Sequence, residues 1–145
     1  MAPPQPRLNW GVWFLLSLAL VGFADASYLT IQHYIGGPLP CSLLKGCQSV
    51  TTSSFATIGP VPIALLGAVY YLIIFVLLLA YFDGRGEKFL VWVSRLSEIG
   101  FFASVWLVYL QIFVIKALCL YCLTSAASST LLFLISTIMV WRKKS

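Results

Sequence analysis

The sequence predicts an all-α integral membrane protein built as a four-transmembrane-helix bundle. Hydrophobic residues make up 61% of the 145 residues and charged residues only 9%, and the mean hydropathy is +0.97. Charged residues supply about a quarter of a typical soluble domain, so the bilayer is the expected solvent. A span needs roughly 20 apolar residues. We therefore expect about four spans in a single membrane domain, residues 1–145, with no separate soluble domain.

The apolar segments and their interruptions place these spans. Residues 35–59 are rich in Gly, Pro, Ser and Thr and too long for a simple connector, which predicts a functional extracytoplasmic loop between the first two helices. Two prolines are acceptable in a first helical turn, so the second span is expected to begin near Pro60. Residues 89–141 lack proline and as one helix would be about 80 Å long, so they must form two spans that turn between Gln111 and Lys116. The predicted spans are residues 10–34, 60–82, 89–112 and 116–141.

The basic residues predict the orientation in the membrane. The formal net charge is +5, but the positive residues cluster at helix ends, so we expect them to orient the chain rather than to bind nucleic acid. The side richer in Lys and Arg should be cytoplasmic, together with both chain termini. That side holds Arg7, Arg85, Lys88, Arg95, Arg142, Lys143 and Lys144, whereas the outer side holds Lys45 and Lys116.

All four cysteines fall on the predicted outer side. Cys41 and Cys47 lie in the loop, and Cys119 and Cys122 lie at the start of the fourth span; together they permit three disulfide pairings. A C-x-x-C pair closes a very small ring, so it is a poor staple and a good redox switch. At a helix start the backbone N–H groups and the helix dipole stabilise the Cys119 thiolate, while Cys122 lies nearly a turn deeper, where an apolar electron acceptor can approach. A relay between the pairs requires one mobile pair, which the Gly/Pro-containing loop supplies.

From about Ala26 to Ala126 the sequence resembles the vitamin K epoxide reductase family in its bacterial form. Five ordered features carry the resemblance: Ala26-Ser-Tyr-Leu-Thr30 at the end of the first helix, the loop pair Cys41 and Cys47, Ser53, the helix entry Gly59-Pro-Val-Pro-Ile-Ala-Leu-Leu-Gly67, and Leu118-Cys-Leu-Tyr-Cys122.

The resemblance implies a bundle around a quinone, either ubiquinone or menaquinone, with a vitamin K type also compatible. Electrons would pass from a thioredoxin-like periplasmic or lumenal protein to the pair Cys41/Cys47, then to Cys119/Cys122, then to the quinone, which drives disulfide formation. Cys122 would face the quinone, and Ser53 would lie near the quinone or the loop cysteines. A prokaryotic inner membrane is the expected location. The partner is expected in trans, because the chain resembles members without the fused thioredoxin-like domain.

Two departures from the vertebrate members bear on the substrate. Those enzymes carry a tyrosine four residues after the second C-x-x-C cysteine and an asparagine in the second helix. Here the corresponding positions are Ala126 and a residue near Ile63. Quinone reduction is therefore favoured over the vertebrate-type reduction of vitamin K epoxide.

Aromatic residues are the remaining candidates for quinone contacts. Tyr109 and Tyr121 lie near the predicted outer end and are the preferred pair. Tyr70, Tyr71 and Trp106 could also line such a site, although aromatic residues in membrane proteins more often pack helices or lie in the interfacial belts.

Three polar features have both functional and structural interpretations. Asp25 lies within a span, where it is either part of a proton route or a hydrogen-bonded packing residue. His33, at the outer end of the first span, is either a proton acceptor or an ordinary interfacial histidine. Arg95 and Glu98 are three residues apart and are expected to form a structural ion pair.

Three rival interpretations remain. Four thiolates on one side of a membrane could bind zinc or copper instead. Alternatively, the cysteines could be structural disulfide staples. The unrelated bacterial disulfide-forming membrane enzyme is disfavoured, because its C-x-x-C motif precedes its wider pair.

Overall fold

A computed structural model describes residues 6–35, 57–116 and 120–144, with side chains in 10–35, 57–116 and 120–142. The predicted site residues Cys41, Cys47, Ser53 and Cys119 lie outside these ranges, whereas Cys122 lies inside them.

The described chain is dominated by long apolar helices. Four of them are long and apolar enough to cross a membrane. This confirms the predicted all-α four-helix membrane bundle. In chain order the elements are α1 (Pro6–Ile35), β1 (Thr57–Ile58), β2 (Val61–Pro62), α3 (Ile63–Phe82), α4 (Lys88–Tyr109), the π-helix η2 (Leu110–Ile115) and α5 (Leu120–Lys144).

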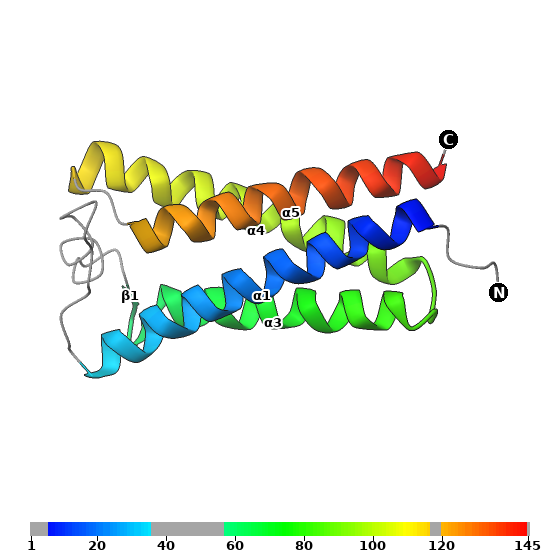
Figure 1. Cartoon of the computed structure of the whole chain (residues 1–145). Helices are drawn as coiled ribbons and strands as arrows, with labels where there is room; N and C mark the ends of the chain where they lie inside the picture. Colours follow the sequence, from blue (N-terminus) through cyan, green and yellow to red (C-terminus); the bar gives the residue numbers. More distant parts are fainter. Residues whose placement is uncertain (1–5, 36–56, 117–119, 145) are drawn as a thin grey trace.

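The four helices form a ring in which each packs against two others. Helix α1 contacts α3 and α5, and α4 contacts the same two helices, so α3 and α5 are diagonal to each other. Figure 1 shows both chain ends and the α3–α4 connection at one end of the bundle. The end of α1, the β-strands, the end of η2 and the start of α5 lie at the other end. The described residues that flank the cysteine-containing segments therefore share one end.

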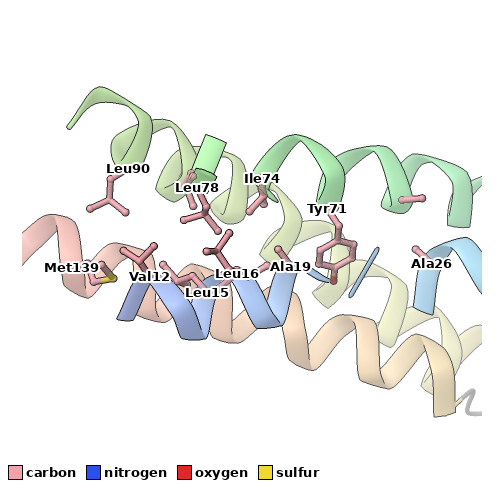
Figure 2. Packing of buried hydrophobic residues seen from close by; sticks show 13 residues of the cluster. Val12, Leu15, Leu16, Ala19, Ala26, Tyr71, Ile74, Leu78, Leu90 and Met139 are labelled. Carbon is pink, nitrogen blue, oxygen red and sulfur yellow. The ribbon is translucent and has the colours of Figure 1, made fainter. Parts of the chain in front are cut away.

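The core follows the bundle axis, and Figure 2 shows its packing. Leu15 of α1, Ile74 and Leu78 of α3, and Leu132 of α5 are fully buried. Towards the termini, Val12, Leu90 and Met139 continue the cluster. Large apolar side chains also cover the outside, for example Trp92 and Phe102, as expected for helices in lipid.

Small polar residues join α4 to α5. The Ser97 and Ser136 hydroxyls are buried and lie 3.1 Å apart, and those of Ser94 and Thr137 are 3.3 Å apart. Small residues and hydroxyl pairs allow close helix approach in membranes, with each hydrogen bond contributing about 0.6 kcal/mol. Nearby on α4, Arg95 and Glu98 form the predicted ion pair, with Nη1 to Oε2 at 3.6 Å.

The second span begins differently from the sequence prediction. Instead of a helical turn at Pro60, residues 57–62 form an antiparallel hairpin in which Thr57 pairs with Pro62 and Ile58 with Val61. Gly59 has φ of +62°, which suits the first central position of a two-residue hairpin turn. Pro62 is extended at φ −70° and ψ 142°, so the helix begins only at Ile63.

The turn after the third span also lies later than predicted. The helix does not stop near Gln111 but continues as η2 to Ile115. It ends at Lys116, which has φ of 57° and ψ of 33° and donates its backbone N–H to the Gln111 carbonyl. A residue in this left-handed conformation is a common helix stop. No glycine or proline precedes Lys116 in this stretch to end the helix earlier.

Candidate functional site

A cavity of about 140 Å³ lies between the helices at the end of the bundle near Lys116 and the β-strands. Every helix contributes to its wall, with most of the lining apolar. Apolar cavities of about 150 Å³ accommodate a benzene ring, so this one is large enough for one six-membered ring. The lining residues include Ala26 and Leu29 of α1, Ile63 and Gly67 of α3, Leu107 and Leu110 of α4 and η2, and Ala126 of α5.

Cys122 is the chemically reactive group in this wall. It is half-buried, on the first turn of α5 as the structure describes that helix, and its side chain lines the cavity. Ser125 follows three residues later, on the same face of α5, and also lines the cavity. A thiol and a hydroxyl thus border one ring-sized apolar space.

Few polar side chains reach the rest of the cavity wall. Gln111 is 2% exposed and lies on η2, so its amide is inside the bundle rather than in lipid. Ser104 of α4 and His33 of α1 complete the polar lining. An amide, an imidazole and two hydroxyls supply hydrogen-bond donors to an otherwise apolar space. Such a pocket, mostly apolar with a few placed polar groups, is typical of small-molecule sites.

Gln111 is the second residue of the π-helix η2. Single π-helical turns within α-helices are frequent at functional sites. Both Leu110 and Gln111 of η2 are buried and line the cavity, while Ile112, Phe113 and Val114 are exposed.

Two tyrosines of α3 cross the bundle to α5. Tyr71 is 2% exposed, and its hydroxyl donates to the Ser125 carbonyl oxygen at 2.6 Å and lies 3.0 Å from Ser125 Oγ. Tyr70 points to the next turn, with its hydroxyl 3.3 Å from Ser129 Oγ. Tyr71 therefore reaches the residue that lines the cavity, whereas Tyr70 reaches one that does not.

The two tyrosines preferred from the sequence occupy other places. Tyr109 is 47% exposed and packs with Trp106 and Phe113 on the outer surface, at ring distances of 5.8 and 5.0 Å. It does not line the cavity. Tyr121 lies beside the Tyr28 ring at 5.4 Å, likewise outside the cavity lining. Their apolar, aromatic character did not distinguish the outer surface from the cavity.

Sequence reasoning treated Gln111 only as a polar interruption and did not consider Ser125 or Ser104. The sequence did contain a signal for Gln111 and for Ser125. Gln111 is a polar residue within an apolar span, a feature that generally faces a bundle interior or cavity, and Ser125 is one helical turn from Cys122.

No group of three or more His, Cys, Asp or Glu side chains placed to hold a metal occurs in residues 6–35, 57–116 and 120–144. The cavity within these ranges is suited to a small, mostly apolar molecule next to a thiol.

Comparison with known proteins agrees with this geometry. The sequence model of the Vitamin K epoxide reductase family matches residues 13–137, which is most of the chain. A search of curated proteins gave no match.

Proposed function

We propose that this chain, which belongs to the vitamin K epoxide reductase family and is therefore a membrane thiol/quinone oxidoreductase, carries electrons from a thioredoxin-like protein to a membrane quinone. In this proposal Cys41 and Cys47 take the electrons from the partner, and Cys119 and Cys122 pass them on. The net result is disulfide formation in the partner's substrates.

The observation that carries the proposal is the position of Cys122. Its side chain borders a ring-sized apolar cavity made by all four helices. A quinone head group is a planar ring with two carbonyl oxygens, which match an apolar space with a few hydrogen-bond donors. When bound, the quinone accepts two electrons and two protons, while the chain's own residues orient the ring and keep water away.

The cavity wall favours a plain quinone over an epoxide. Vertebrate-type members carry a tyrosine and an asparagine at positions that correspond to Ala126 and a residue near Ile63. Ala126 and Ile63 both line the cavity, and neither can form a side-chain hydrogen bond with an epoxide oxygen.

The membrane orientation in this proposal follows the charges. Arg85, Lys88, Arg95 and Arg142 belong to elements at or near the end of the bundle that holds both termini, and Lys116 lies at the other end. The positive-inside rule makes the first end cytoplasmic. The cysteine-bearing end then faces the periplasm of a prokaryotic inner membrane, where a thioredoxin-like partner in trans can reach it.

The test is a quinone-reduction assay under anaerobic conditions. The purified protein is reduced, the reductant is removed, and a soluble ubiquinone or menaquinone analogue is added. Quinone absorbance and the number of alkylatable thiols are followed together. We expect quinone to be consumed as thiols disappear, and Cys122→Ala to abolish the reaction.

Other outcomes would contradict the proposal. Thiols that stay reduced, with bound zinc or copper found in the same preparation, would favour the metal-binding alternative. If Cys122→Ala lowers the thermal stability but leaves quinone turnover unchanged, the cysteines are structural staples.

A further inference from the structure

A buried polar cluster lies beside the cavity, where α1, α3 and α5 meet. Tyr71 spans the diagonal of the bundle from α3 to α5, and its hydroxyl contacts Ser125 twice, at 2.6 Å to the carbonyl oxygen and 3.0 Å to Oγ. The ring passes Gly22 of α1, where an added Cβ would overlap it. This close approach fixes the hydroxyl next to a residue of the cavity wall.

Asp25 joins the cluster from α1. It lies three residues after Gly22, so it is on the face of α1 that Tyr71 packs against. The Asp25 carboxyl lies near enough to Tyr71 for its charge to act on the tyrosine hydroxyl, and its Oδ2 atom is buried. The next residue, Ala26, lines the cavity. A carboxyl group inside a membrane span is costly, and those that persist commonly serve substrate paths or proton relays.

We propose that Asp25, Tyr71 and Ser125 form a proton route that serves the cavity beside Cys122. This inference rests on the proposed function, since it requires electron transfer from thiols to a quinone. Ser125 is the member that borders the reacting groups, and Asp25 and Tyr71 act through it.

The proton balance defines what the route does. Oxidation of the Cys119 and Cys122 thiols breaks two S–H bonds and forms one S–S bond, and two electrons reduce the quinone to a quinol. The two thiol protons end on the two quinol oxygens, so no external acid is consumed. In an apolar cavity the proton released from Cys122 needs an acceptor until a quinol oxygen takes it up. Hydroxyl groups both accept and donate, so the Ser125 and Tyr71 hydroxyls can pass this proton to the Asp25 carboxylate and back.

The kinetic test compares Asp25→Asn, Tyr71→Phe and Ser125→Ala with the matched control Tyr70→Phe. Tyr70 is the neighbouring residue on α3 and contacts Ser129, which does not line the cavity. Proton transfer by a positioned group contributes roughly 10²–10⁴-fold to a rate. We expect all three variants to lower the single-turnover rate of quinol formation at least about tenfold, with the quinone KM nearly unchanged and a larger solvent deuterium isotope effect. Tyr70→Phe should keep the wild-type rate.

A spectroscopic measurement makes the test independent of turnover and of quinone. Infrared difference spectra between the disulfide and dithiol forms should contain a carboxyl band that Asp25→Asn removes and Tyr71→Phe shifts. Tyr70→Phe should leave this band in place. Ser125→Ala keeps the backbone carbonyl that accepts the Tyr71 hydrogen bond, and alanine is a good helix former, so the helix should stay folded. This variant therefore tests proton transfer through the Ser125 hydroxyl even if a change at Tyr71 disturbs folding.

The outcomes separate this inference from the function on which it rests. If the wild-type protein does not reduce quinone, the proposed function fails. If the wild type is active but Asp25→Asn and Ser125→Ala keep its rate and isotope effect, the proton route is refuted. The same holds if His33→Gln, rather than Asp25→Asn, lowers the rate and enlarges the solvent isotope effect.

Discussion

At the residue scale, the cavity combines one thiol with a small set of polar groups in an apolar wall. Cys122 and Ser125 come from α5 and Gln111 from η2, and Ala126 and Gly67 keep the space between them open. The small residues matter as much as the polar ones, because a cavity of about 140 Å³ admits one ring and little more. Changes of a few atoms in this wall should therefore alter quinone binding.

Filling the cavity should impair quinone use without unfolding the bundle. Ala126→Leu adds three carbons to the cavity wall, where overpacking typically costs 1–3 kcal/mol. We expect the quinone KM to rise about tenfold or more, since 1.4 kcal/mol corresponds to a factor of ten. Steady-state kinetics measure this. Ala127→Leu is the matched control, because Ala127 is the exposed neighbour on α5 and should leave the KM unchanged.

Removing the buried amide should weaken quinone binding more than it affects the thiols. Gln111 is only 2% exposed, and Gln111→Leu introduces a side chain of similar size that lacks the amide hydrogen-bond donors. A hydrogen bond contributes about 0.5–1.5 kcal/mol, so we expect a KM increase of roughly 2- to 12-fold. The number of reactive thiols should not change.

The control for the amide is Gln32→Leu. Gln32 is half-buried on α1 and does not line the cavity. If both substitutions raise the KM equally, the effect comes from a general change in the bundle and not from a contact with the quinone.

At the element scale, close helix approaches hold the cavity in shape. The Tyr71 ring lies against Gly22, and the Tyr70 hydroxyl lies against Gly100, so α3 can reach past α1 and α4 to the serines of α5. Helices in lipid gain little from hydrophobic burial against one another, and they depend on such packing and hydrogen bonds. A side chain at either glycine would force the tyrosine away from its partner.

Gly22→Ala should destabilise the bundle. The new Cβ would overlap the Tyr71 ring and displace it from Ser125. We expect a loss of about 1–3 kcal/mol in the free energy of unfolding. Denaturant unfolding in detergent micelles checks this.

The same substitution at Gly67 provides the comparison. A Cβ there would meet only the Cβ of Ala26 at 3.6 Å, an ordinary contact. Gly67→Ala should keep or raise the stability, because alanine is favoured over glycine in helices by about 1 kcal/mol. Equal losses in the two variants would show that Gly22 has no special packing role.

The sequence was sufficient to predict the helices but not every boundary. Length and hydropathy set the number of spans, since apolar runs of this size can only cross the bilayer as helices. The hairpin at residues 57–62 was missed because Pro60 and Pro62 suit either a first helical turn or an extended segment. The left-handed conformation of Lys116 has no sequence signal, because glycine and asparagine are the usual residues there.

At the scale of the whole molecule, the bundle is packed at one end and hollow at the other. The core cluster follows the axis from Met139 and Leu90 to Ala26, where the cavity begins (Figure 2). Tight packing at the end that holds both chain termini can fix the four helices, while their opposite ends surround a small molecule. This difference between the two ends is consistent with a reaction near one membrane surface.

The helix faces were the least predictable property of the fold. Ile74 is fully buried whereas its neighbour Ile73 is 45% exposed, and both are isoleucines in an apolar helix. In a soluble protein polarity would mark the outer face, but lipid accepts the same residues as the core does. Tyr109 was preferred from sequence because it lies near the extracytoplasmic end of a span, which does not reveal its helix face, and its side chain lies on the lipid-facing surface. The position of Tyr71 required the structure. The roles assigned to Cys41, Cys47, Ser53 and Cys119 stay predictions, since these residues lie outside the described ranges.

The difference between the two ends of the bundle allows its orientation in the membrane to be tested. Ile58 is 63% exposed in the hairpin at the cavity end, and Asp83 is exposed in the α3–α4 connection at the other end. In a background without the four native cysteines, Ile58→Cys and Asp83→Cys provide one reporter for each side. We expect a membrane-impermeant maleimide to label Ile58→Cys in intact cells and Asp83→Cys only after permeabilisation, because the basic residues near Asp83 favour the cytoplasm.

The reverse labelling pattern would place the cavity end in the cytoplasm, where thiols are kept reduced. Electron flow from exported proteins to a quinone would then be impossible by the proposed route, whatever the chemistry at Cys122. A permeabilised sample of each variant controls for thiol reactivity, since both reporters must label equally once the membrane barrier is removed. Orientation and chemistry are thus tested separately, the first by labelling and the second by the quinone assay with Cys122→Ala.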